Sequence, residues 1–166
     1  APALYRFRQV HGLLVQPRHV VYSLRGCLDP GLAIFNTPGI EVIALTMPAG
    51  AADLRACGLA DRISELVVEP LDDPEGLRRA HAHLFANRGV RYLDCEGGQT
   101  VLRALHRAGL LDEVFLTETD VVVDESRHAR VLKTFEFERE DAELIAEGRT
   151  GLASPWRFRR WRFNRR

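Results

Sequence analysis

Apolar and polar positions are arranged along the chain in two ways, as short apolar runs and as longer amphipathic segments. The apolar runs are rich in β-branched and aromatic residues and predict strands at residues 19–23, 41–46, 66–68, 90–95 and 112–119. The amphipathic segments each end at a glycine and predict helices at residues 51–57, 74–87 and 99–108. This alternation is typical of an α/β domain with a mixed, mostly parallel sheet and helices on both faces.

The pattern changes in the C-terminal part of the chain. Residues 121–123 and 133–138 are short apolar or alternating stretches, and residues 155–163 alternate aromatic and arginine side chains. The aromatic parity slips at Arg159–Arg160, so we expect a β-bulge there that returns the later aromatic residues to the face of the earlier ones. We therefore expect an antiparallel C-terminal part. Because no linker and no internal repeat is present, we expect one domain over residues 1–166.

The composition is that of an ordinary soluble domain. Of the 166 residues, 46% are hydrophobic and 28% charged, and the 23 basic residues balance the 23 acidic ones, which excludes a globally basic nucleic-acid binder. Six of the basic residues are arginines within residues 156–166, which hold no acid, so the rest carries 17 basic against 23 acidic residues. No apolar run approaches the roughly 20 residues of a membrane span. Three cysteines without a C-x-x-C pair fit a reducing compartment, so we expect a cytoplasmic protein.

The segment Tyr92–Leu102 carries the strongest functional signal. A predicted strand ends in a carboxylate, two glycines follow at 97 and 98, and a helix begins. Paired glycines permit positive φ and a close approach of a ligand to the backbone, and the dipole of a helix start favours a phosphate. Glu96 would repel that phosphate, so we expect it to accept hydrogen bonds from a neutral partner such as a sugar hydroxyl or a heterocycle N–H. On the local pattern alone, a tight turn with a solvated Glu96 explains the segment equally well.

In its longer context, this segment resembles a known family. Glu96-Gly97-Gly98 is followed by the helix residues Leu102–Leu105, then by Ala108-Gly109-Leu110-Leu111-Asp112-Glu113 and an apolar strand. This order is similar to that of the reductase domain of riboflavin-biosynthesis deaminase/reductases, within the dihydrofolate-reductase superfamily. Upstream, Pro17–Val21 and Val42–Thr46 resemble two further strands of that family. The likeness covers roughly residues 16–123, and the combination of Glu-Gly-Gly with Leu-Asp-Glu is its most specific part.

The resemblance implies a dihydrofolate-reductase-like fold and NADPH-dependent reduction of the ribose of a ribosylaminopyrimidine phosphate. It also implies a homodimer that acts on a small molecule, without a metal, a membrane or a nucleic acid as partner. Glu96 matches the carboxylate that contacts the substrate, while no residue is assigned to catalysis itself. The residues that match NADPH-binding positions are Ser23, Thr46, Gly97, Gly98, Gln99, Thr100, Val101 and Leu102.

Two departures from the family pattern concern the substrate pocket and the front of the sheet. Asp120 and Asp124 stand near positions where family members carry Pro and Gly, which affects the shape of the substrate pocket. The family's first strand and its Gly-rich turn are not found, because residues 1–15 align after them. We therefore expect the N-terminal strands of the sheet to be missing. Buried backbone groups without partners cost about 1–3 kcal/mol each, so we expect the chain by itself to be neither a stable nor an active monomer.

Other candidate sites carry less weight, and two alternatives to a reductase stay open. His81 and His83 lie two residues apart on a predicted helix, so they point to different faces and favour surface histidines over a metal site. The apolar pattern around Cys95 favours an inert core thiol. Residues 156–163 fit nucleic-acid binding or, in our preferred interpretation, a half-buried edge strand. Because of the changes near residues 120–124, a non-catalytic protein that keeps the fold is the other alternative.

Overall fold

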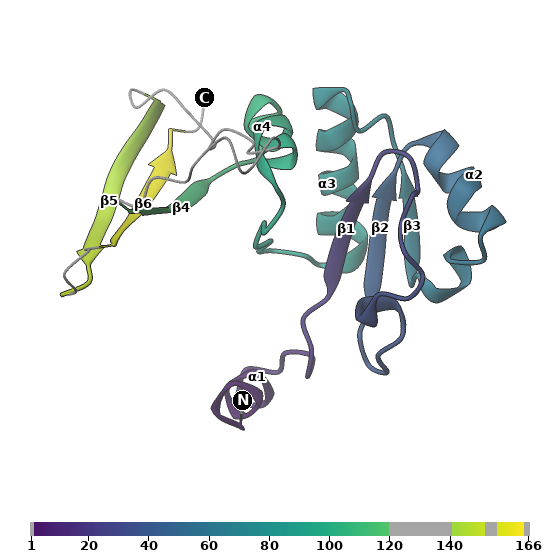
Figure 1. Cartoon of the computed structure of the whole chain (residues 1–166), viewed down its shortest axis with the longest axis horizontal. Coiled ribbons are helices and arrows are strands. Elements are labelled where there is room, and N and C mark those ends of the chain that lie inside the picture. The colour runs from purple at the N-terminus through teal and green to yellow at the C-terminus, as the bar shows by residue number, and fades with distance from the viewer. Residues whose placement is uncertain (1, 120–140, 152–155, 165–166) are drawn as a thin grey trace, which may run out of the picture. The chain divides into compact units, whose positions relative to one another are not determined.

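A computed structural model describes residues 2–119, 141–151 and 156–164, which belong to two compact units, Ala1–Tyr92 and Leu93–Arg166 (Figure 1). The elements of the first unit are α1 (Pro2–Val10), β1 (His19–Ser23), η1 (Ala33–Phe35), β2 (Val42–Thr46), α2 (Pro48–Ala56), η2 (Ala60–Arg62), β3 (Glu65–Val68) and α3 (Pro74–Arg88). Those of the second unit are α4 (Gln99–Arg107), β4 (Glu113–Glu118), β5 (Ala142–Arg149) and β6 (Arg157–Phe163). None of the described helices has the length and apolar character that crossing a membrane requires.

β2 is the central strand of a parallel three-stranded sheet in the first unit. The strand order is β1-β2-β3, and Ala44 of β2 lies opposite both Val21 of β1 and Leu66 of β3. All five residues of β2 are buried, as expected for a parallel strand that is covered on both faces. On one face, Leu54 of α2 belongs to the same hydrophobic cluster as Ala44. Figure 1 shows the three strands flanked by α2 and α3.

α3 contributes the remaining cover of the parallel sheet. Its buried residues include Leu77, Ala80 and Leu84, which recur at helical spacing. The hydroxyl of Tyr22 in β1 lies 2.8 Å from Nε2 of His81 in α3. The predicted arrangement of helices around a buried parallel sheet is therefore confirmed for this unit.

The two ends of α3 follow the signals in the sequence. At the start, the Asp73 side chain accepts a hydrogen bond from the N–H of Gly76 at 3.0 Å, and Pro74 occupies the first helical turn. At the end, Gly89 has φ = 62°, the left-handed region that favours glycine, and its N–H donates to the carbonyl of Leu84. The helix ends one residue later than predicted.

A network of charged side chains lies where the strands of the parallel sheet begin. Glu65 at the start of β3 accepts a hydrogen bond from Arg88 and lies 2.7 Å from Nε2 of His83. Arg18 donates to Glu41 at 2.6 Å, and Arg88 lies 3.6 Å from the same carboxylate. Burial raises the pKa of Glu65, but the hydrogen bonds from Arg88 and His83 outweigh it and hold that pKa below its ordinary value. The network thus joins β3, α3 and the residues that precede β1 and β2.

The second unit contains an antiparallel sheet with the order β4-β6-β5. Trp161 and Phe163 of β6 are buried with Val114 of β4, and Leu102 of α4 packs against this cluster. On β4, Val114 is buried while Phe115 is 72% exposed. The predicted alternation of that strand is therefore confirmed, as is the mixed α/β class. Within the described residues, the parallel and antiparallel strands form two separate sheets instead of the single mixed sheet that we expected.

The β-bulge predicted at Arg159–Arg160 is wrong. β6 keeps its alternation, with Trp161 and Phe163 buried and Phe158 exposed on the other face. The irregularity of the register lies in β5 instead, at residues 144–146. The alternation can continue because Arg159, on the same face as Trp161, is held by ion pairs to glutamates of both neighbouring strands.

The strand predicted at residues 90–95 is also wrong, because this stretch has no regular secondary structure. A strand needs backbone partners, and the described strands pair only within their own two sheets. Tyr92 is 95% exposed, and Cys95, expected in the core, is partly exposed. The single domain over residues 1–166 stays a prediction. The predictions for four further places lie outside the described residues: residues 121–123, residues 133–138, Asp120 and Asp124.

The network at Glu65 makes the stability of the fold depend on pH. Because its pKa is held below the ordinary value of 4.5, the Glu65 carboxylate stabilises the folded chain above that pH, and this contribution is lost as the pH falls through the folded-state pKa. We expect Glu65→Gln to lower the free energy of unfolding at neutral pH by about 1 kcal/mol. We also expect it to flatten the decline of stability in acid. Urea unfolding followed by circular dichroism at several pH values measures both effects.

The matched control for this experiment is Glu75→Gln. Glu75 pairs with Arg78 on the exposed surface of α3, where such pairs contribute little. We expect its acid profile to follow that of the unmodified chain. A Glu65→Gln profile parallel to that of the unmodified chain would contradict the prediction.

Candidate functional site

The predicted residues Ser23 and Thr46 meet at the carboxyl ends of β1 and β2. They lie opposite each other in the register, and the hydroxyl of Thr46 donates to the carbonyl of Ser23 at 2.6 Å. Thr46 is fully buried, and its side chain holds the ends of β1 and β2 together. Ser23 is half-buried. In open α/β sheets, ligands bind outside the carboxyl ends of the strands, which is where these two residues lie.

The loop after β1 and the start of α2 are in close backbone contact at this end of the sheet. Gly26 has φ = 67°, and a Cβ on it would lie 2.2 Å from the carbonyl oxygen of Gly50. A Cβ on Gly50 would in turn lie 2.2 Å from the hydroxyl oxygen of Thr46. Both positions therefore require glycine. The loop, the helix start and the buried Thr46 are locked together by this contact.

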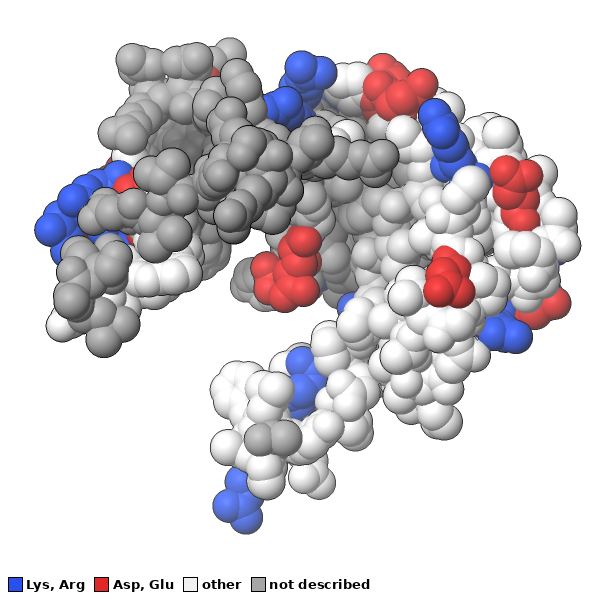
Figure 2. Space-filling model, in the orientation of Figure 1, with Lys and Arg blue, Asp and Glu red and all other residues white. Residues whose placement is uncertain are grey.

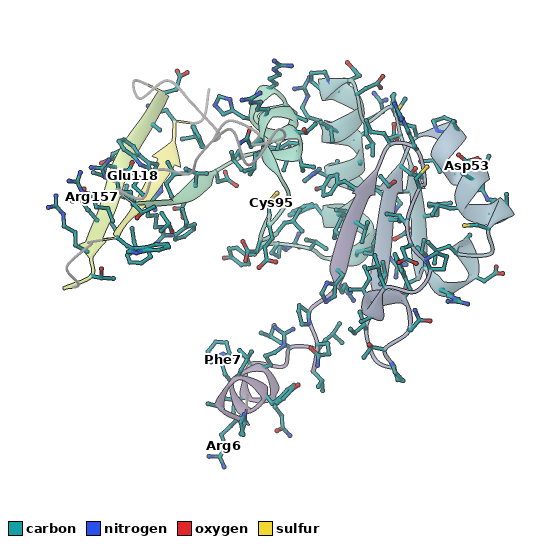
Figure 3. All side chains as sticks on the ribbon, in the orientation of Figure 1. Arg6, Phe7, Asp53, Cys95, Glu118 and Arg157 are labelled. Atoms are coloured by element: carbon teal, nitrogen blue, oxygen red, sulfur yellow. The ribbon has the colours of Figure 1, made fainter. Side chains whose placement is uncertain are left out.

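A pocket of about 590 Å³ opens beside this contact. Its lining residues are Leu24, Arg25, Cys27, Met47, Pro48, Ala49, Asp53 and Asp72. Most of the lining is apolar, with one cation and two carboxylates among it; Figure 3 shows Asp53 on α2. None of these lining residues was identified from the sequence. The available signal was their position, since Leu24 and Met47 directly follow the two predicted strands.

The start of α2 adds a positive end to the pocket. The N-cap residue Met47 provides no side-chain hydrogen bond, and Pro48 occupies the first helical position. Uncapped N–H groups and the helix dipole favour an anion at such a place. Together with the guanidinium of Arg25, the helix start suits a phosphorylated ligand.

The other predicted residues lie at the start of α4. Gly98 is the N-cap, with φ = −65° and ψ = 174° and no side-chain cap. Neither Gly97 nor Gly98 has a positive φ, so the left-handed conformation that the sequence permits is not used. A Cβ on Gly98 would meet no atom of the described residues within 4 Å, whereas one on Gly97 would lie 3.1 Å from Cβ of Val101. The backbone at Gly98 therefore faces open space at a helix start, which fits a phosphate group.

The side chains around this helix start divide into exposed and packed ones. Glu96 and Thr100 are exposed, while Gln99 and Val101 are half-buried. Leu102 packs against the hydrophobic cluster of the second unit. Glu96 is thus available to a ligand through its side chain, whereas Leu102 serves to hold the helix on the sheet.

His81 and His83 are half-buried and contact neighbouring side chains of the first unit instead of being fully solvated. His81 bonds with Tyr22, and burial lowers the pKa of the His81 imidazole. His83 bonds with Glu65 through Nε2 and with Asn87 through Nδ1. Both histidines connect α3 to the sheet. Across the described ranges of the chain, no cluster of three or more His, Cys, Asp or Glu side chains is suited to a metal ion.

Three arginines of β6 are engaged in ion pairs across the antiparallel sheet. Their hydrogen bonds hold the pKa values of the partner glutamates Glu113 and Glu147 below the ordinary range. Figure 2 shows acidic and basic side chains interspersed over the visible described surface, without a continuous basic face. A nucleic acid would have to compete with these pairs, which weighs against the nucleic-acid alternative. The pairs are Arg159 with Glu118 and Glu147, and Arg160 and Arg162 with Glu113.

Comparisons with known proteins bear on the fold as a whole. No family model and no curated protein matches the chain. Among solved structures, a pyrimidine reductase-like protein from Corynebacterium diphtheriae is similar, with a TM-score of 0.76 and 22% sequence identity. The similarity covers 100% of this chain and 68% of that chain. The chain therefore has the dihydrofolate-reductase-like α/β fold that its sequence resembles.

Proposed function

We propose that the chain is a nicotinamide-dependent reductase that acts on a pyrimidine-type substrate. The observation that carries the proposal is the likeness of fold, over the whole chain, to a pyrimidine reductase-like protein. The sequence resemblance extends the proposal to NADPH as cofactor and to a ribosylaminopyrimidine phosphate, of the riboflavin-biosynthesis type, as substrate. Two places support it: the start of α4, which suits a phosphate, and the pocket beside β1 and β2, whose lining is mostly apolar.

In this proposal the second unit binds the pyrophosphate of NADPH through the open backbone at Gly98 and the N–H groups of the α4 start. Taken by itself, the pocket of the first unit suits the adenosine end of a dinucleotide, because apolar walls such as Leu24 and Met47 suit the faces of adenine and Arg25 can pair with a phosphate. The hydrogen bond between Thr46 and Ser23 fixes the strand ends that lead into the pocket residues Leu24 and Met47. NADPH supplies the hydride, and the protein supplies orientation and electrostatics.

Glu96 contacts the substrate in this proposal. An ionised carboxylate accepts hydrogen bonds and donates none, so it orients hydroxyl or heterocycle N–H groups. Its exposed side chain directly precedes the glycines that bind the cofactor, so it can place the substrate near the cofactor without contacting the phosphates. We further propose that the protein acts in the cytoplasm as a homodimer.

The direct test is to measure NADPH binding by calorimetry and NADPH oxidation with a ribosylaminopyrimidine phosphate. The proposal expects saturable binding and oxidation that depends on the substrate. Binding of NADPH without oxidation would favour the non-catalytic alternative. Absence of binding would contradict the proposed function.

Gly98→Val tests the cofactor site at α4. A valine side chain there would fill the open space that faces the backbone, so we expect the Kd for NADPH to rise at least tenfold, or about 1.4 kcal/mol. The fold should persist because none of the residues that the structure describes has an atom within 4 Å of the new Cβ. Gly148→Val in β5 is the matched control, since Gly148 also has open space and no positive φ. Unchanged NADPH affinity in folded Gly98→Val would remove α4 from the cofactor site.

Glu96→Gln tests the substrate contact separately from the cofactor site. The change keeps the shape and removes the charge, so NADPH affinity should stay within about twofold. Hydrogen bonds to a charged group contribute about 1.5–3 kcal/mol, so substrate affinity or turnover should fall roughly 10- to 150-fold. Glu143→Gln, an exposed position on β5, controls for the loss of one surface charge. Full activity of Glu96→Gln would show that Glu96 is a solvated side chain beside a tight turn.

A further inference from the structure

The pocket beside β1 and β2 holds three charged side chains that bear on its choice of ligand. Arg25 follows β1, Asp53 lies on α2 and Asp72 precedes α3, and all three line the same pocket. Figure 3 labels Asp53 on its helix. No ion pair or side-chain hydrogen bond joins any of the three to another residue in the described part of the chain, and all three are exposed. Their charges are therefore available to a ligand in the pocket.

Negative and positive side chains favour different substituents at the 2′ position of the adenosine ribose, a free hydroxyl or a phosphate. A carboxylate accepts hydrogen bonds from free ribose hydroxyls, and an arginine accommodates a phosphate on the 2′ position; this is how NAD and NADP sites commonly differ. A 2′-phosphate carries up to two negative charges, so each carboxylate nearby repels it. Because Asp53 and Asp72 outnumber Arg25, the charged side chains of the lining sum to −1.

We infer that this pocket binds NADH at least as tightly as NADPH, with Asp53 and Asp72 as the residues that offset Arg25. The inference rests on the proposed function, since it assumes that the pocket takes the adenosine end of the dinucleotide. It changes the expectation from the family resemblance, which implies NADPH. The preference for NADH depends on the carboxylates of Asp53 in α2 and Asp72 before α3, which the family resemblance does not single out.

The size of the effect follows from the exposure of the three side chains. Interactions between exposed charges are typically worth 0.2–1 kcal/mol, which corresponds to about 1.4- to 5-fold in affinity for each carboxylate. Two carboxylates together should therefore change the ratio of the two dissociation constants by roughly 2- to 25-fold. Salt should shrink this change, because exposed charges are screened.

The experiment measures Kd for NADH and for NADPH by calorimetry at low and at high salt. The variants are the double variant Asp53→Asn with Asp72→Asn, the variant Arg25→Gln, and the control Asp61→Asn. Asp61 is an exposed carboxylate in η2 outside the pocket lining, so its change alters net charge without altering the pocket. Far-ultraviolet circular dichroism checks that each variant is folded.

We expect the unmodified chain to bind NADH as tightly as NADPH or more tightly. The double variant should gain affinity for NADPH relative to NADH by at least about twofold, and Arg25→Gln should lose affinity for NADPH relative to NADH. Asp61→Asn should leave the ratio unchanged.

NADPH bound more tightly than NADH by the unmodified chain, by more than the error of the two titrations, would overturn this inference and leave the proposed function standing. An equal ratio in the double variant and in Asp61→Asn would overturn it in the same way. Failure of both dinucleotides to bind would contradict the proposed function itself, and the inference with it.

Discussion

The burial of β2 is the constraint on which the first unit depends. Its five residues are all buried, so the strand needs a partner strand on each side and a cover on each face. β1 and β3 supply the partners, and α2 and α3 supply the cover. Because the three strands are parallel, their carboxyl ends lie at the same edge of the sheet. The chain must then leave this edge through loops, and those loops form the pocket.

The pocket is shaped by contacts that leave little freedom to the backbone. The hydroxyl of Thr46 donates a hydrogen bond to the carbonyl of Ser23, which holds the ends of β1 and β2 together. Gly26 and Gly50 allow the loop after β1 to touch the start of α2. These contacts fix the backbone that carries the charged side chains, so a change in one of those charges changes the affinity for a ligand. In the second unit, Leu102 anchors α4 to the hydrophobic cluster, and Gly98 leaves the first turn of this helix open.

The sequence predicts well the elements whose signals are local. The cap at Asp73, the glycine at 89 and the buried strand predicted at 41–46 depend on nearby residues; the structure confirms all three, with the strand at 42–46. Residues 90–95 have the composition of a strand but lack backbone partners in the described sheets, and composition cannot report a missing partner. The register irregularity lies in β5 instead of β6. β6 keeps its alternation through Arg159, which has ion pairs with Glu118 and Glu147, and such pairs join distant parts of the sequence.

Two further features escaped the sequence analysis for related reasons. The helix α1 was not predicted, because none of its residues is buried and it lacks the apolar face of a helix that packs on a core. The pocket residues Arg25, Asp53 and Asp72 come from three separate segments and share a site only through the fold. The candidate residues Ser23, Thr46 and Gly98 were assigned because they match cofactor-binding positions of the family that the sequence resembles. In the structure, Ser23 and Thr46 end strands and Gly98 begins a helix.

Amide hydrogen exchange with and without saturating NADPH, read by mass spectrometry, tests the central claim most directly. That claim is that the pocket at the strand ends of the parallel sheet binds the dinucleotide. It predicts slower exchange in residues 24–27 and 47–51 when NADPH is bound, with β5 and β6 unchanged. Protection confined to β6, or none in these two segments at saturation, would contradict the account.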